Sequence, residues 1–199
     1  MKMATLTVFT PLYNRINTLK RTYESLKRQT SKDFVWLIID DGSTDNPYEI
    51  IKEWIKINNG FEIKYVYKEN GGMHTAHNTA YENIDTELNV CVDSDDYMPD
   101  NAVQLIIDCW NKNKNKGYAG IIALDFADST KKVIGKELPT DKESTTLMGY
   151  YNNGGFGDKK LIYRTDIIKQ TPPYPVFDNE KYVALAYKYH LIDEKYELK

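Results

Sequence analysis

Short apolar segments alternate with amphipathic helical patterns through the first 124 residues, and this alternation limits the folds that the chain can adopt. Residues 34–39 are continuously apolar, as in a strand buried on both faces of a sheet. Strands that alternate with helices are typical of a parallel sheet with helices on both faces. The sequence therefore predicts an α/β fold with a single, mostly parallel sheet flanked by helices. Further strands are predicted at residues 6–9, 63–67, 88–92 and 119–124.

Capping and stop signals predict where the intervening helices begin and end. Asn17 is expected to cap the first helix, and Gly60 is expected to stop the second. The third helix is predicted from about residue 75 to 83, and Pro99 and Asp100 are expected to open the fourth.

Beyond about residue 126 the pattern weakens, although no domain boundary is visible. An edge strand is predicted at residues 133–138 and a last strand at residues 161–163. Residues 1–199 are therefore expected to form one domain. A final helix is predicted to carry on one face Val183, Ala186, Tyr187 and His190.

Composition excludes several classes of protein. The 199 residues carry a net charge of −3 without a long basic stretch, which argues against nucleic acid as a partner. Residues 1–9 lack the features of a signal peptide, and no stretch of about 18 apolar residues predicts a transmembrane helix. Cys91 and Cys109 lie in apolar patterns and are expected to be small core residues. A cytoplasmic protein is predicted.

The acidic tetrad Asp93-Ser94-Asp95-Asp96 directly follows the predicted strand at residues 88–92. Three carboxylates in four residues repel one another, and a hard divalent cation among them makes the arrangement favourable. Such a cation can hold a diphosphate at the carboxyl end of a strand, where open α/β sheets bind ligands. An acidic, solvated loop is the alternative interpretation of this segment on its own.

Polar clusters also follow the first three strands, at residues 11–15, 40–45 and 69–74. Because these loops share one edge of a parallel sheet, they are expected to converge on one ligand crevice. Pro11 and Tyr13 could seat a flat base, and Asp41 could accept a hydrogen bond from the imide N–H of uracil. Gly71 and Gly72 allow the backbone to approach a ligand closely. Each cluster alone is also compatible with ordinary turn and helix-cap chemistry.

In their order and content these clusters resemble a family 2 glycosyltransferase with the GT-A nucleotide-sugar-binding fold. The resemblance covers residues 5 to about 110 and is much weaker beyond. It implies a nucleotide-binding part at about residues 1–110 and an acceptor-side part at about 111–199, which many relatives continue further. The matching segments are residues 8–14, 25–30, 40–45, 70–72 with 76–78, and 93–96.

The resemblance implies a role for each of the predicted site residues. Asp95, with its neighbour Asp96, is expected to bind Mn²⁺ or Mg²⁺. Pro11, Tyr13 and Asp41 fall where the family holds uridine, and Asp93 falls near the ribose and sugar. The full predicted nucleotide-binding set is Pro11, Tyr13, Asn14, Arg15, Asp41, Asn70, Gly71, Gly72, His77, Asp93 and Ser94.

The chain departs from the family pattern where many members carry arginine and this chain carries His77. His77 can still bind a phosphate, but it is not a permanent cation. Met73 stands where some relatives have lysine, so diphosphate affinity would depend more on the metal. For the general base, the resemblance favours Glu180, with Asp178 as a close competitor. Alternatively, Asp178 or Asn179 only caps the final helix.

The expected activity is inverting, metal-dependent transfer of a hexose or N-acetylhexosamine from a UDP-sugar to an acceptor hydroxyl. The implied acceptor is a glycan or a lipid-linked molecule in bacterial polysaccharide or cell-surface glycan synthesis, which is compatible with peripheral association at the inner face of the membrane. Two alternatives remain open: a nucleotide-sugar-binding module without transfer activity, and a sugar-nucleotide pyrophosphorylase. The glycine-free loop at residues 11–15 argues against the pyrophosphorylase.

Overall fold

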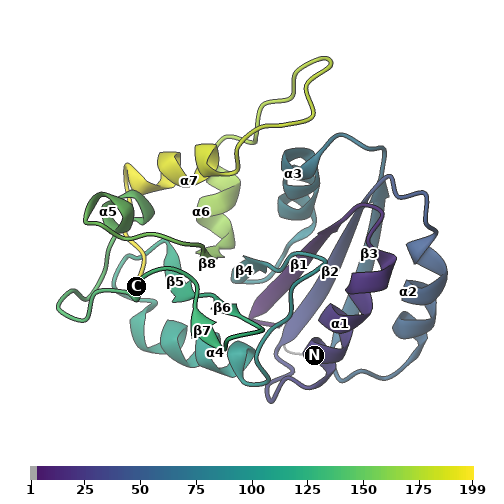
Figure 1. Ribbon diagram of the computed structural model, residues 1–199, viewed down its shortest axis with the longest axis horizontal. Helices are drawn as coiled ribbons and strands as arrows, with labels where there is room; N and C mark the ends of the chain where they lie inside the picture. Colours follow the sequence, from purple (N-terminus) through teal and green to yellow (C-terminus); the bar gives the residue numbers. More distant parts are fainter. Residues whose placement is uncertain (1–3) are drawn as a thin grey trace.

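A six-stranded sheet with the order β3-β2-β1-β4-β8-β5 forms the centre of the computed structural model, which describes residues 4–199 (Figure 1). The strands β1, β2, β3 and β4 are mutually parallel, and β8 is antiparallel to both of its neighbours. The predicted α/β fold with a mostly parallel sheet is confirmed. The strands are β1 (Leu6–Leu12), β2 (Phe34–Asp41), β3 (Glu62–Lys68), β4 (Leu88–Cys91), β5 (Gly120–Leu124) and β8 (Lys159–Arg164).

Helices cover both faces of the sheet, and each face has its own apolar core (Figure 1). On one face Tyr23 stacks on Trp54 with ring centroids 4.1 Å apart, and both pack beside Trp36 of β2. On the other face Phe9 packs edge-on against Tyr81. The first face carries α1 (Ile16–Lys27), α2 (Pro47–Lys56) and α4 (Ala102–Asn113), and the second carries α3 (Met73–Asn83), α5 (Leu147–Asn152), α6 (Thr165–Gln170) and α7 (Ala186–Asp193).

The strand β8 is predicted from the sequence, but its position in the sheet is not. It lies between β4 and β5, so the last strand of the chain joins the edge strand β5 to the rest of the sheet. The edge strand predicted at residues 133–138 is wrong. Instead, β7 (Lys132–Val133) pairs with β6 (Phe126–Ala127) in a separate two-stranded sheet. Extension stops because Gly135 has φ +82° and packs directly against the backbone of Phe156.

Strand β1 continues beyond the predicted residues 6–9, through Pro11 to Leu12. The backbone of Phe9 bonds toward β4, where its carbonyl accepts from Val92 N–H. Pro11 has the same orientation, but the pairing with β4 ends at Phe9, so no partner strand needs an N–H from Pro11.

Several helix boundaries also differ from the sequence prediction. Asn17 lies inside α1, whose first-turn Ile16 N–H instead donates to the Asp45 carboxylate at 3.0 Å. Gly60 lies beyond the end of α2, and α3 begins at Met73, two residues earlier than predicted.

The beginning of α7 at Ala186 places Val183 outside the final helix. It also means that neither Asp178 nor Asn179 caps this helix, so the capping alternative is wrong.

The prediction about a signal peptide falls partly on residues 1–3, which lie outside the described residues. Within residues 4–199, no helix combines the length and apolar character needed to cross a bilayer.

Candidate functional site

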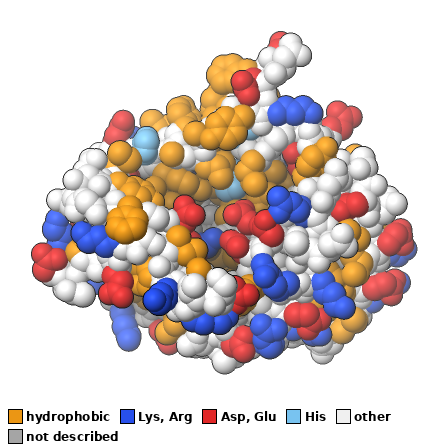
Figure 2. All heavy atoms as spheres, in the orientation of Figure 1, with side chains coloured by type: hydrophobic (Ala, Val, Ile, Leu, Met, Phe, Trp, Pro, Cys, Tyr) orange, Lys and Arg blue, Asp and Glu red, His pale blue; other side chains and the backbone are white. Residues whose placement is uncertain are grey.

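Loops that follow β1, β2, β4 and β5 place acidic and basic side chains at one edge of the sheet. In the surface view, acidic side chains gather around a hollow near the middle of the face, beside basic ones and below an apolar region (Figure 2). Contacts between distant segments confirm the convergence, because Arg15 after β1 pairs with Asp95 after β4. The polar clusters of the sequence therefore meet, as predicted from the sheet.

The acidic tetrad forms a turn that α1 holds in place. The Asp96 N–H donates to the Asp93 carbonyl at 2.9 Å. Two side chains of α1 bind the same turn, because Thr22 Oγ1 donates to the Asp96 carbonyl at 2.7 Å and Arg21 donates to the Asp95 carbonyl. The backbone of the turn is thereby fixed, while the side chains of Asp95 and Asp96 stay about half exposed, at 47% and 56%.

Asp125 and Lys160 belong to this cluster and were missed by the sequence analysis. The Lys160 ammonium lies 3.9 Å from a carboxylate oxygen of Asp96 and 3.9 Å from one of Asp125. Asp125 directly follows β5, so the strand-end pattern that singled out the tetrad could have found it. Lys160 gave no comparable signal, because its place beside β4 depends on the insertion of β8.

Burial and neighbouring charge oppose each other in this cluster. Burial raises the pKa of Asp93 and of Asp125 above the usual range, and the Lys160 ammonium partly counteracts this. For Lys160, burial lowers the pKa, but the surrounding carboxylates, Asp125 foremost, outweigh burial and raise it. Lys160 therefore remains charged and serves as an internal counter-ion for the acidic cluster.

The donor set fits a cation that is shared with substrate phosphates. Among residues 4–199, no group of three or more His, Cys, Asp or Glu side chains is arranged to hold a metal by itself. Mg²⁺ is commonly bound through one or two carboxylates together with substrate phosphates. Asp95 and Asp96 supply two half-exposed carboxylates whose present partners, Arg15 and Lys160, are long side chains.

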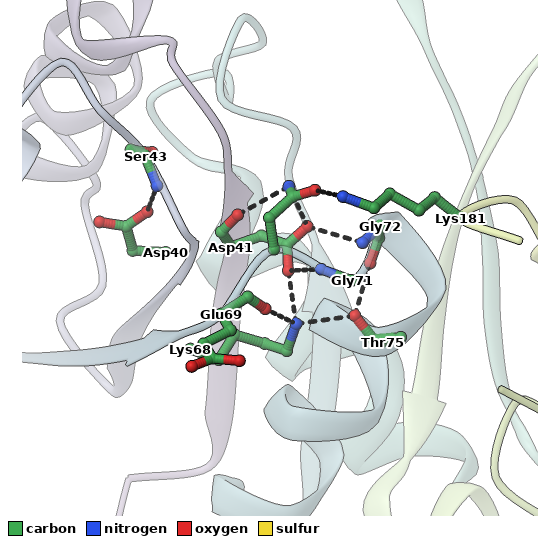
Figure 3. Close-up of polar contacts among 10 residues, drawn as sticks. Asp40, Asp41, Ser43, Lys68, Glu69, Gly71, Gly72, Thr75 and Lys181 are labelled. Atoms are coloured by element: carbon green, nitrogen blue, oxygen red, sulfur yellow. Dashed lines mark hydrogen bonds and ion pairs between the residues drawn. The ribbon is translucent and has the colours of Figure 1, made fainter. Parts of the chain in front are cut away.

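The Asp41 carboxylate organises the loop formed by residues 69–72 (Figure 3). Its Oδ1 accepts from Lys68 Nζ at 2.5 Å and from Gly71 N–H at 3.0 Å. Its Oδ2 accepts from Gly72 N–H at 2.9 Å and from Asn70 Nδ2 at 3.1 Å. Asp41 is only 4% exposed, and its four bonds use the acceptor capacity of a carboxylate. A ligand N–H at Asp41 would therefore have to replace one of these donors.

Residues at the end of β1 divide between exposed and structural positions. Tyr13 is 49% exposed, whereas Pro11 is buried inside β1. Asn14 has φ +52°, and its Oδ1 accepts from the Thr44 N–H at 2.7 Å. Asn14 thus links this loop to the turn after β2. Of Pro11 and Tyr13, only Tyr13 presents an exposed ring.

His77 occupies a core position, which corrects the prediction that it binds a phosphate. It is 1% exposed, with Nδ1 3.2 Å from Tyr81 OH and Nε2 3.7 Å from Cys91 Sγ. Burial, assisted by the neighbouring His74, lowers the pKa of His77 to about 3. The imidazole is therefore neutral near pH 7 and offers no positive charge to a phosphate. Ser94 is likewise buried, at 7% exposed.

The two predicted base residues lie in the connection between α6 and α7, at residues 171–185. A tight turn pairs Phe177 with Glu180, and Asn179 within it has φ +64°. Asp178 and Glu180 are both exposed, and Glu180 Oε1 accepts from the Tyr182 N–H at 2.9 Å. The adjoining Lys181 reaches Asn70 in the loop at residues 69–72. The turn with its carboxylates is thereby linked to that loop.

Comparison with known proteins supplies a family for this arrangement. The family model described as "Glycosyl transferase family 2" matches residues 7–171. An uncharacterized glycosyltransferase of Rickettsia conorii is 30% identical over 146 residues, which cover 71% of this chain but 24% of that protein. The chain thus spans about a quarter of the length of this relative.

Two solved structures share the fold. S. aureus TarS 1-349 in complex with UDP superposes with a TM-score of 0.63 and 23% identity, covering 86% of this chain and 50% of that one. The mannosyltransferase PcManGT from Pyrobaculum calidifontis, in complex with GDP-Man and Mn²⁺, gives a TM-score of 0.62 at 15% identity and covers 88% and 48%. The match identifies the sheet and its helices as a GT-A fold.

Proposed function

The chain belongs to glycosyl transferase family 2, and from this premise we propose that it transfers a sugar from a UDP-sugar to an acceptor hydroxyl with inversion and with the help of Mn²⁺ or Mg²⁺. One observation carries the proposal. Two half-exposed carboxylates, Asp95 and Asp96, follow β4 at the same sheet edge where the glycine loop follows β3, and Lys181, next to the exposed Glu180, is hydrogen-bonded to that glycine loop.

The donor side of the proposed reaction is formed by the loops that follow β1, β2, β3 and β4. Tyr13 offers an exposed ring to the nucleobase, and the loop at residues 69–72 is held in place by the Asp41 carboxylate, which accepts from the N–H groups of Gly71 and Gly72. Asp95 and Asp96 would hold the divalent cation, which neutralises the charge that develops on a departing diphosphate. Arg15, now paired with Asp95, would be released toward the phosphates when the cation takes its place.

The acceptor side is formed by the exposed turn at residues 177–180. Glu180, or its competitor Asp178, takes the proton of the acceptor hydroxyl as that oxygen attacks the anomeric carbon, while the diphosphate leaves from the opposite face. The single displacement inverts the anomeric centre and needs no covalent intermediate. A hexose or an N-acetylhexosamine is the proposed sugar, and a glycan or lipid-linked molecule the proposed acceptor.

Support for a UDP-sugar comes from the predicted uracil contact of Asp41 and from the UDP complex of TarS. Support for a cation comes from the acidic tetrad and from the Mn²⁺ complex of PcManGT. Bacterial polysaccharide synthesis at the cytoplasmic side of the membrane is the proposed setting.

A screen of nucleotides for thermal stabilisation tests the donor and the metal together. UDP, UDP-sugars and GDP-mannose are compared with Mn²⁺ and with EDTA. Binding at 100 times the dissociation constant stabilises the native state by about 2.7 kcal/mol, which is a readily measured shift in Tm. We expect stabilisation by UDP and a UDP-sugar that requires Mn²⁺. If GDP-mannose stabilises the protein and UDP and UDP-sugars do not, the proposed donor is wrong. Donor binding without any sugar transfer to acceptors would favour a nucleotide-sugar-binding module.

A further inference from the structure

Residues 171–185 are fixed to α3 at their base. Asn78 of α3 exchanges two hydrogen bonds with the backbone of Tyr174, because its Oδ1 accepts from the Tyr174 N–H and its Nδ2 donates to the Tyr174 carbonyl, both at 2.9 Å. The Tyr174 hydroxyl donates to the Leu185 carbonyl at 3.0 Å and joins the two ends of the connection. From this base the connection projects beyond α3 and α7 in the view of Figure 1.

Away from this base, the connection meets the loop at residues 69–72 through Lys181. The Lys181 ammonium donates to Asn70 Oδ1 at 2.7 Å, a contact that spans 111 residues of sequence (Figure 3). The backbone meets the loop as well, since a Cβ on Gly72 would lie 2.1 Å from the Lys181 carbonyl oxygen. Gly72 also has φ +94°, so both the conformation and the contact with Lys181 require glycine.

Asn70 is in turn hydrogen-bonded to Asp41. Its Nδ2 donates to the Asp41 carbonyl at 2.8 Å and to the Asp41 Oδ2 at 3.1 Å. With both of these acceptors on its NH₂ side, the amide must turn its oxygen toward Lys181. The side-chain amide of Asn70 therefore bridges Asp41, which is proposed to bind the uracil ring, and Lys181, which follows Glu180 in the chain.

We propose that Lys181 is a positioning residue, which fastens the turn carrying Glu180 to the nucleotide loop through Asn70 and the backbone at Gly72. The inference rests on the proposed function, because Glu180 and the nucleotide loop take their roles from it. A nucleotide that displaces the Asn70 amide from the Asp41 carboxylate changes the hydrogen bonds of Asn70 and thereby those of Lys181. Donor binding and the placement of the acceptor-side carboxylate are coupled through this contact.

Hydrogen–deuterium exchange of the full chain tests the contact with and without UDP and Mn²⁺. Lys181→Met removes the ammonium, Lys181→Arg keeps a donor, and Lys52→Met changes an exposed lysine of α2 as the matched control. In the free protein we expect Lys181→Met to speed exchange at residues 176–184 about tenfold, the population change expected when one hydrogen bond to a charged group is lost. Lys181→Arg and Lys52→Met should exchange like wild type.

The same comparison with UDP and Mn²⁺ tests the coupling. UDP should slow exchange at residues 176–184 in wild type and in Lys181→Arg, and should leave it unchanged in Lys181→Met, while the UDP affinity stays within about twofold. Turnover should then show a lower kcat for Lys181→Met at an unchanged donor KM. Wild-type exchange in free Lys181→Met would overturn the contact, and lost UDP affinity with unchanged kcat would make Lys181 a donor-binding residue instead. Failure of wild type to bind UDP contradicts the proposed function, whereas the exchange of the free variants still decides the role of Lys181.

Discussion

The guanidinium of Arg15 pairs with the carboxylate of Asp95, which joins the end of β1 to the end of β4 across 80 residues of sequence. Both groups are about half exposed, so the pair contributes little to stability. Its significance is that the carboxylate proposed to bind a cation is paired with a cationic side chain of the protein itself.

The first prediction follows for Asp95→Asn. The variant keeps the size of the side chain but loses its charge, so UDP affinity measured by calorimetry with Mn²⁺ should fall by about 10- to 100-fold. With EDTA, the variant and wild type should bind UDP alike. Asp108→Asn changes an exposed carboxylate of α4 and serves as the control. Equal UDP affinity of Asp95→Asn and wild type in Mn²⁺ would remove Asp95 from the metal site.

The second prediction concerns Asp41 and the identity of the nucleobase that it contacts. Asp41→Ala should weaken UDP binding by about 1–3 kcal/mol, the cost of leaving a buried polar group without its partner. CDP should lose less, since cytosine has no imide N–H. The variant also leaves the N–H groups of Gly71 and Gly72 without their acceptor, so its Tm should fall in the absence of nucleotide. An equal loss for UDP and CDP would show that Asp41 acts only by shaping the loop.

A third prediction separates catalysis from donor binding. Glu180→Gln keeps the hydrogen bond to the Tyr182 N–H but cannot take a proton, so transfer should fall by about 10²–10⁴ at an unchanged UDP-sugar affinity. Asp178→Asn is the matched variant in the same turn and should retain activity. The reverse outcome assigns the base to Asp178, and full activity in both variants places it outside this turn.

The fourth prediction concerns the internal counter-ion. Lys160→Met removes a positive charge 3.9 Å from carboxylate oxygens of Asp96 and Asp125, so Mn²⁺ alone should bind about fivefold more tightly, or by about 1 kcal/mol. Lys160→Arg should bind Mn²⁺ like wild type. Titration of free Mn²⁺ by electron paramagnetic resonance measures both. An unchanged affinity in Lys160→Met would mean that Lys160 and the cation do not compete.

The last prediction is a pH dependence of stability that arises from His77. Its pKa of about 3 in the folded state lies below the usual value of 6.5, so the unfolded state binds the extra proton first as the pH falls. This contribution is fully present above pH 6.5 and is lost toward pH 3. It should lower the free energy of unfolding by about 2 kcal/mol between pH 7 and pH 5.

Urea unfolding at the two pH values measures this loss. His77→Gln should be less stable than wild type at pH 7 but should lack the acid-sensitive part, whereas His190→Gln, at an exposed position, should keep it. The same loss in His77→Gln as in wild type would assign the acid sensitivity to other groups.

Local patterns sufficed for those parts of the molecule that depend on neighbours in sequence. The apolar run at residues 34–39 identified β2, and the position of polar clusters after strands identified the edge at which Asp95 and Arg15 meet. The prediction that His77 binds a phosphate was wrong, because the sequence predicts that His77 lies on a helix but not whether it faces the core or the ligand. Its helix α3 turns His77 toward Tyr81 and Cys91.

Contacts that depend on topology could not be predicted in this way. Lys160 reaches the acidic cluster because β8 lies between β4 and β5, and nothing in the apolar pattern of β8 specifies its partners. The contact of Lys181 with Asn70 likewise joins two loops far apart in sequence. Both contacts lie at the proposed site. The fold could therefore be predicted from the sequence more completely than the side-chain contacts of the site.

The place of β8 also has a consequence for how the protein is made. As the chain leaves the ribosome, β5 appears well before β8, and in the finished sheet β5 pairs with β8 rather than with β4. A nascent chain from which β5 has emerged, but β8 has not, therefore exposes one open edge on β4 and an unpaired β5. Open strand edges invite pairing with other chains. Translation pauses at this stage would favour aggregation or capture by a chaperone, and the emergence of residues 159–164 from the ribosome removes that hazard.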